Sequence, residues 1–160
     1  MADRLCCAAA VRCPLSVRHG RGSYTWGGGC YEYTGDFVFG VKHGRGVMRC
    51  GAEQGALPAH SIYEGEFAHG EMSGSGCQRW RDGSSYTGHF QAGEMHGEGE
   101  WHGADGSTYE GAFSRNVRSG FGILSEADAQ HQGEFFQHKK HGQGSTRWKD
   151  GSAHDGEWVR

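Results

Sequence analysis

Apolar residues and glycines alternate with polar residues in the segment 86–108. Tyr86, Gly88 and Phe90 lie two residues apart, so in a β-strand they share one face. The same alternation returns in a second run, formed by Gly97, Gly99 and Trp101. Turn-forming residues follow each run. The segment therefore predicts a β-hairpin, with one turn over residues 91–95 and another over residues 104–106.

This hairpin unit recurs along nearly the whole chain. Its first strand begins at Tyr63, Tyr86 and Tyr109, which are spaced by 23 residues. Tyr33 takes this place earlier in the chain, before an insertion over residues 51–61, and histidines take it later. The second strand recurs as pairs of glycines two residues apart, namely Gly20 and Gly22, Gly44 and Gly46, Gly74 and Gly76, Gly97 and Gly99, Gly120 and Gly122, and Gly142 and Gly144. A fixed period of this length is typical of a solenoid or array.

The repeats predict an all-β fold, an elongated single-layer antiparallel sheet of tandem β-hairpins. The 30 glycines and the aromatic residues, 12% of the chain, are in register, which favours a packed sheet over a flexible linker. Leu, Ile, Val and Phe are too few for a thick globular core. The chain also lacks a run of about 18 apolar residues, so no segment is predicted to span a membrane.

The array occupies residues 18–160, with five full repeats between two half repeats. It opens on a second-strand half, residues 19–26, and finishes on a first-strand half, residues 154–158. An open strand edge exposes unpaired backbone groups, so we expect another chain, either a partner or a second copy, to pair with at least one terminal strand. Residues 1–17 lie outside the pattern and predict an irregular N-terminal arm, with a targeting segment or a lipid anchor at Cys6 and Cys7 left open.

These residues resemble the MORN repeat, whose consensus is roughly Y-x-G-x-F/W-x-x-G-x-x-H-G-x-G followed by an aromatic residue and a D-G turn. The resemblance extends from Arg18 to the C-terminus. The chain departs from the consensus at a few positions, which are His131 and His154 for the leading tyrosine, Asn116 and His138 for the loop glycine, and Ser73 and Ser119 for the histidine.

The resemblance implies a non-enzymatic scaffold that binds other proteins. Similar MORN-repeat proteins occur in ciliary structures such as radial spokes and in other cytoskeletal assemblies, so we expect a cytoplasmic protein of the cytoskeleton or ciliary axoneme. Two alternatives stay open. The first is a module apposed to membranes, with Lys139, Lys140, Arg79 and Arg81 near anionic lipid. The second is a regulatory subunit that acts in trans on an enzyme, as in lipid kinases or lysine methyltransferases that carry MORN repeats.

We expect the aromatic and glycine ladder to be structural and also to form the protein-binding face. A single-layer sheet should leave so regular a row partly exposed, and exposed apolar rows mark partner sites. The alternative is that the row packs only on itself and on the N-terminal arm. The residues predicted to form this aromatic face are Tyr33, Phe37, Tyr63, Phe67, Trp80, Tyr86, Phe90, Trp101, Tyr109, Phe113, Phe135, Trp148 and Trp158.

The sequence predicts no enzyme, no cofactor and no metal site. The glycine pairs continue into strands, where a phosphate-binding loop needs a helix N-terminus, and no catalytic motif is present. The recurrent histidines would lie near 10 Å apart, too far to share an ion. The net charge of −3 and scattered basic residues argue against nucleic-acid binding. The six cysteines lack disulfide-framework or zinc spacing, which favours a reducing compartment.

Overall fold

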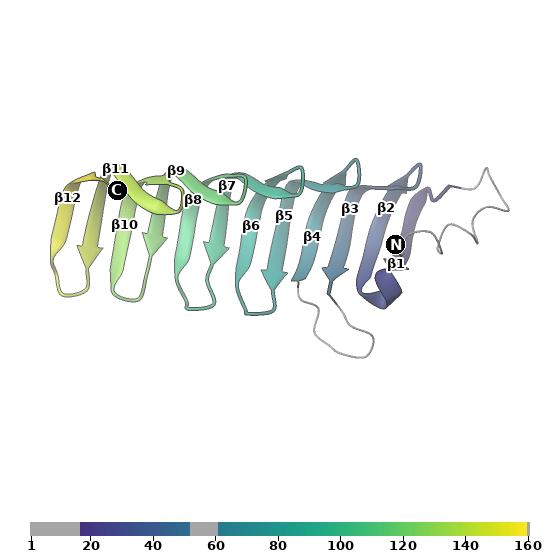
Figure 1. The fold of residues 1–160 in the computed structure, drawn as a ribbon, viewed down its shortest axis with the longest axis horizontal. Helices are drawn as coiled ribbons and strands as arrows, with labels where there is room; N and C mark the ends of the chain where they lie inside the picture. Colours follow the sequence, from purple (N-terminus) through teal and green to yellow (C-terminus); the bar gives the residue numbers. More distant parts are fainter. Residues whose placement is uncertain (1–16, 52–60, 160) are drawn as a thin grey trace.

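The computed structural model describes residues 17–51 and 61–159, which form one sheet of twelve antiparallel strands. The strands follow one another in chain order, so each pairs only with its sequence neighbours and the sheet extends as an open ribbon (Figure 1). The all-β prediction is thus confirmed. The strands are β1 (Gly20–Trp26), β2 (Tyr31–Val38), β3 (Val41–Cys50), β4 (Ser61–Ala68), β5 (Glu71–Trp80), β6 (Ser85–Gln91), β7 (Glu94–His102), β8 (Thr108–Ser114), β9 (Val117–Ser125), β10 (Ala129–Phe136), β11 (Lys139–Trp148) and β12 (Ala153–Trp158).

Helix is nearly absent from the described residues. A single 3₁₀ turn, η1 (Gly27–Gly29), joins β1 to β2. No described helix is long and apolar enough to cross a membrane. The predicted N-terminal arm lies outside the described residues except for Val17, and so does most of the predicted insertion.

Two-residue turns close the five hairpins. In the β6–β7 hairpin the turn is only Ala92 and Gly93, shorter than the predicted range 91–95, and both residues have positive φ, 51° and 81°. Two successive left-handed residues match the twist of the flanking strands. The other four turns show the same signature, at Phe39 and Gly40, His69 and Gly70, Arg115 and Asn116, and Gln137 and His138.

The predicted aspartate-glycine turns join one hairpin to the next. In the turn after β7, the Asp105 carboxylate accepts hydrogen bonds from the Ser107 backbone N–H at 2.9 Å and from the Ser107 hydroxyl at 2.6 Å. These two bonds lower the pKa of Asp105. The same pair of bonds recurs between Asp82 and Ser84 and between Asp150 and Ser152. The aspartates therefore fix turns.

Each hairpin carries an irregularity beside its glycines. In β6 and β7 the register shifts between Gly88 and Phe90, because β7 holds extra residues at Gly97 and Glu98. Gly97 has a φ of 66°, in the left-handed region that favours glycine. Within each of the five hairpins, the two glycines of the pair therefore have different roles. The first permits the bulge, and the second pairs directly with a glycine of the preceding strand, as Gly99 does with Gly88.

The two outermost strands lie at opposite ends of the ribbon (Figure 1). Within the described residues, β1 pairs only with β2 and β12 only with β11. No second chain is present, so the expected edge pairing stays a prediction.

Candidate functional site

The aromatic residues of the repeats form one continuous ladder of edge-to-face contacts. Tyr86 contacts Phe90 of its own repeat at a centroid distance of 5.2 Å and Phe113 of the next repeat at 5.0 Å. These contacts recur along the ribbon with centroids 4.9–5.3 Å apart and interplanar angles of 77–90°, a favourable arrangement for aromatic quadrupoles. The rings follow in the order Phe37, Tyr33, Phe67, Tyr63, Phe90, Tyr86, Phe113, Tyr109, Phe135, His131, Trp158 and His154.

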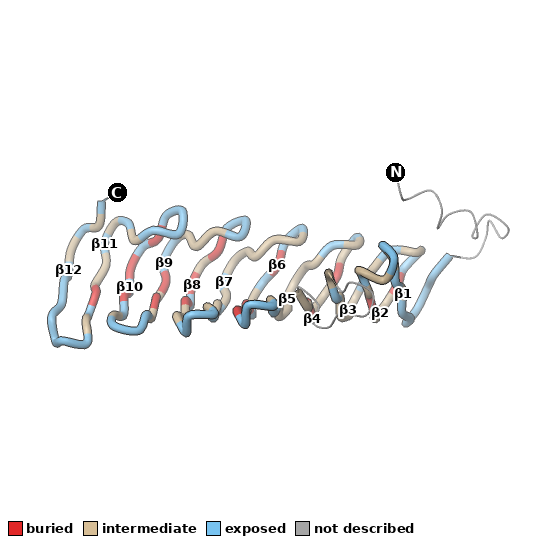
Figure 2. Tube along the Cα trace, turned by 60° about the horizontal axis from the view of Figure 1, so that its bottom comes forward, coloured by how far each residue is buried: buried red, intermediate tan, exposed pale blue. Residues whose placement is uncertain are grey.

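Most of this ladder is buried, so the expectation of a partly exposed aromatic row is wrong for most of its residues. The buried residues recur from one hairpin to the next across the ribbon (Figure 2). Nine of the thirteen predicted face residues are at most 4% exposed, and they are Tyr33, Phe37, Tyr63, Phe67, Tyr86, Phe90, Tyr109, Phe113 and Phe135. The four tryptophans, Trp80, Trp101, Trp148 and Trp158, are half-buried. The aromatic row is mainly the core of the sheet.

Glycines explain how a single sheet buries its tyrosines. The ring of Tyr86 lies on the Gly88 and Gly99 backbone, where a Cβ at Gly88 would come within 2.5 Å of the Tyr86 Oη. The hydroxyl donates a hydrogen bond to the His89 carbonyl at 3.1 Å. Burial raises the pKa of Tyr86 to about 12. Tyr63 and Tyr109 have the same arrangement and the same pKa.

A second recurrent position covers the ladder from outside. Two residues before the first glycine of every pair stands a long, unbranched side chain. The Arg118 guanidinium, for example, lies 5.4 Å from the centre of the Tyr109 ring, and the Lys42 ammonium lies 5.8 Å from that of Tyr33. The six residues at this position are Arg18, Lys42, Met72, Met95, Arg118 and Lys140.

The hairpin turns are tied to this covering position. The Gly93 N–H donates to the Met72 carbonyl at 2.9 Å, and the Asn116 N–H donates to the Met95 carbonyl at 3.0 Å. The same bond from a turn to the preceding repeat occurs five times in the described chain. Neighbouring repeats are therefore joined by backbone bonds outside the strand ladder, which helps to exclude water from the tyrosines.

His131 interrupts the series of tyrosines. Its Nδ1 lies 2.7 Å from the Thr146 Oγ1, while its buried Nε2 has no hydrogen-bond partner among the described residues. Burial, with a smaller effect from Lys140, lowers the pKa of His131 to about 4. The histidine is therefore held neutral inside the ladder.

This arrangement predicts that acid weakens the C-terminal repeats. The pKa of His131 is below its unfolded value of about 6.5, so its contribution to stability is complete above pH 6.5 and is lost as the pH falls towards 4. We expect about 1–3 kcal/mol of extra acid destabilisation compared with His131→Tyr, measured by urea unfolding between pH 7 and pH 4. His154→Tyr, which alters an exposed histidine, should keep the acid response of the wild type. Equal acid responses in wild type and His131→Tyr would contradict this account.

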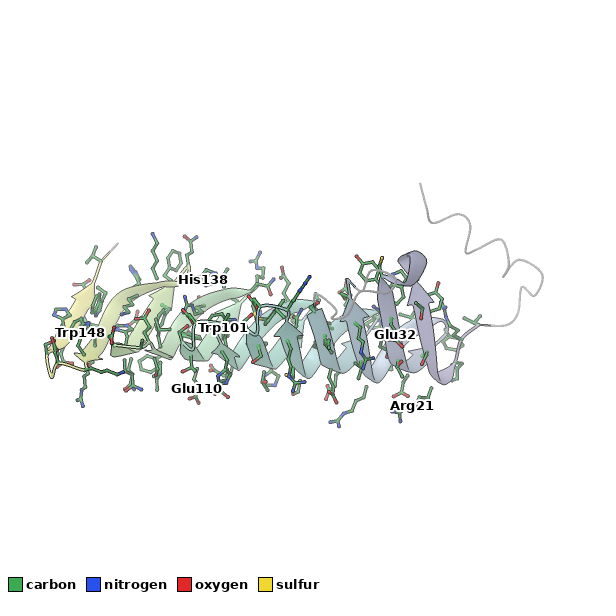
Figure 3. The ribbon with its side chains drawn as sticks, turned by 90° about the horizontal axis from the view of Figure 1, so that it is seen from below. Arg21, Glu32, Trp101, Glu110, His138 and Trp148 are labelled. Atoms are coloured by element: carbon green, nitrogen blue, oxygen red, sulfur yellow. The ribbon has the colours of Figure 1, made fainter. Side chains whose placement is uncertain are left out.

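The opposite face of the sheet is polar and carries a long groove. Its volume is about 890 Å³, and its floor is the backbone around the paired glycines. The lining side chains come from β1 through β8, with Arg21 at one limit and Glu110 at the other. Figure 3 shows these two residues projecting from the same side of the ribbon, away from His138. A smaller hollow of about 170 Å³ opens on the aromatic side beside Trp101.

Charges divide unevenly along this groove. Arg21 and Arg45 line it on β1 and β3, while its carboxylates line it on β4, β7 and β8 and are all exposed. These carboxylates are Glu64, Glu98, Glu100 and Glu110. The groove therefore has a net acidic lining, and the predicted aromatic residues do not contribute to it.

No group of three or more His, Cys, Asp or Glu suited to a metal ion occurs among the described residues. The recurrent histidines lie in separate repeats, and the carboxylates of the turn aspartates accept hydrogen bonds from serines. The arrangement offers surfaces for binding.

A family model for the MORN repeat matches most of the chain. The matched segments are residues 16–31, 33–51, 63–85, 86–108, 109–125 and 131–153. The chain belongs to the MORN-repeat family. The matches follow the structure closely, since the segment 86–108 begins at the second residue of β6 and contains β7 and the turn after it. MORN repeats are commonly interaction modules for proteins or membranes and are non-catalytic.

Two features of these faces were not predicted from the sequence. The covering position could have been found, because every repeat places a long side chain two residues before its first glycine. The acidic groove was less visible, because its carboxylates lie on three strands and meet only through the strand register. Glu100 and Glu110, for instance, belong to different hairpins but are directly paired.

Proposed function

We propose that this MORN-repeat chain is a non-enzymatic scaffold, a cytoplasmic component of a cytoskeletal or axonemal assembly that binds other proteins along its ribbon. The supporting observation is the groove, which is open to solvent and crosses eight consecutive strands of one sheet. A continuous surface of this kind suits an elongated partner, as in other solenoid proteins. The ciliary part of the proposal comes from the resemblance to MORN-repeat proteins of ciliary structures.

The packing of the ribbon also supports a structural role. Each repeat contributes rings to its neighbour and a turn bond to the preceding repeat. Bending the ribbon would strain the edge-to-face rings and the turn bonds at the same time. A stiff rod with a repeating surface can hold partners at fixed spacing, which is the task of a scaffold.

Membrane binding is less favoured by the charges of the described residues. Lys140, one of the basic residues suggested for lipid contact, lies 3.8 Å from the Glu126 carboxylate and 5.4 Å from the Trp158 ring. The groove itself carries four carboxylates, which anionic headgroups would repel.

Detergent extraction of ciliated cells tests the scaffold proposal. We expect the tagged chain to stay with the detergent-resistant axoneme or cytoskeleton, and the purified chain to remain unbound in flotation with vesicles that contain anionic lipid. If the chain is extracted into the detergent-soluble fraction and floats only with anionic vesicles, the membrane alternative is favoured and the scaffold proposal is contradicted. Neutral vesicles provide the control for nonspecific adsorption.

A further inference from the structure

We propose that the groove binds an extended, basic segment of a partner protein, whose Lys or Arg side chains contact Glu98, Glu100 and Glu110. This inference rests on the proposed scaffold function and specifies the chemistry of the partner. It concerns the polar face of β1–β8, not the buried aromatic ladder.

The strand register shows which groove charges lack a counterpart. Arg21 is paired directly with Asp36, and Arg45 with Glu66, so each arginine faces a carboxylate across the ladder. Glu64 faces only Val47 and Cys77, and Glu98 faces Ala112. In the direct strand register, the two arginines thus face carboxylates, while Glu64 and Glu98 face uncharged residues.

Glu100 and Glu110 are two negative charges that face each other in the strand register. They are directly opposite each other on β7 and β8, and both are exposed on the groove face. Like charges in this position destabilise a sheet. The only described ion-pair contact of either residue joins the Glu100 Oε1 to the His102 Nε2 at 3.0 Å. A cationic side chain placed between the two carboxylates would relieve their repulsion, and a guanidinium could donate hydrogen bonds to both carboxylates.

The dimensions of the groove favour a polypeptide over a small cation. From β1 to β8 there are seven strand spacings, and at roughly 4.8 Å each the groove runs for about 34 Å. An extended segment of about ten residues has this length. The strand N–H and C=O groups under the groove already pair within the sheet, so side-chain charges, not strand addition, would hold the segment.

A binding titration tests the inference with a defined probe. The probe is a fluorescent ten-residue peptide of alternating Ser and Arg, and the comparison peptide alternates Ser and Glu. We expect the arginine peptide to bind the wild type and the triple variant Glu98→Gln, Glu100→Gln, Glu110→Gln to bind it roughly tenfold more weakly. The glutamate peptide should not bind either protein.

A second triple variant controls for net charge. Glu71→Gln, Asp128→Asn and Glu157→Gln neutralise three exposed carboxylates that do not line the groove. This variant should bind the arginine peptide as the wild type does. Equal weakening in the two triple variants, or no binding by the wild type, would overturn the inference, since either result removes the groove from the interaction.

Thermal unfolding gives an independent readout. Because the paired glutamates repel each other, Glu110→Gln alone should raise Tm by about 1–4 °C while it weakens peptide binding. A purely structural role for Glu110 would give the reverse, a lower Tm with unchanged binding, and would contradict the inference. Circular dichroism of each variant verifies that the sheet is intact.

The scaffold proposal and the groove inference fail in different ways. If the tagged groove variant stays with the detergent-resistant axoneme or cytoskeleton as fully as the wild type, the groove is not the binding surface and only this inference fails. If the wild type itself is extracted by detergent, the scaffold proposal fails, whatever the peptide titration shows.

Discussion

Replacing Gly88 with valine should destabilise a central repeat more than other single substitutions in that repeat. A Cβ at Gly88 would lie 2.5 Å from the Tyr86 Oη and 2.6 Å from the Gly99 Cα. The ring would have to leave its place, and the backbone of the paired strand cannot move without breaking the ladder. We expect a loss of about 3 kcal/mol or more in the free energy of unfolding, from overpacking and from the displaced ring.

Hydrogen exchange read by mass spectrometry locates this effect. Repeat arrays unfold less cooperatively than globular domains, so protection should fall most in β6 and β7 and less in β1 and β2. Gly22→Val is the matched control, because a Cβ at Gly22 would have the Phe37 ring at 3.9 Å as its nearest neighbour. If Gly88→Val kept wild-type protection, the glycines would serve chain flexibility and not the close approach of a ring.

The strand pattern of this protein was predictable because each repeat carries the same alternation of residues. Tyr86, Gly88 and Phe90 alternate in the same way as Tyr63, Gly65 and Phe67, and a pattern that recurs at a fixed period leaves little room for a different register. The two-residue turns were less predictable. His138 takes the place of the loop glycine and is left-handed as that place requires, but the first turn residues, such as Phe39, carry no sequence signal for their positive φ.

Exposure of the aromatic face was mispredicted for a physical reason. A one-layer sheet was expected to leave a row of rings partly exposed. Tyr33 is 0% exposed because three groups surround its ring. The ring packs on two glycine backbones, Phe67 of the next repeat contacts it edge to face, and the Lys42 side chain covers it. These contacts join three strands and depend on the directions in which the side chains point, which periodicity does not supply.

Truncating Tyr86 to alanine should be nearly as costly as adding a side chain to Gly88. The ring bridges Phe90 and Phe113 and covers Gly88 and Gly99, so its removal opens a cavity between two repeats. We expect a loss of about 3–5 kcal/mol, measured by urea unfolding, as for other buried aromatic residues. Tyr86→Phe removes only the hydroxyl bond to the His89 carbonyl and should cost about 1 kcal/mol.

The same variants test whether the ladder supports the groove on the other face. Thr87, Gly88 and His89 line the groove directly behind the Tyr86 ring, so loss of the ring should disturb the groove floor as well as stability. We therefore expect Tyr86→Ala to weaken binding of the arginine peptide at concentrations of urea that leave the wild type folded. Tyr31→Ala, which alters a tyrosine that is 41% exposed and outside the groove lining, should not. Unchanged peptide binding by a destabilised Tyr86→Ala protein would show that the two faces act independently.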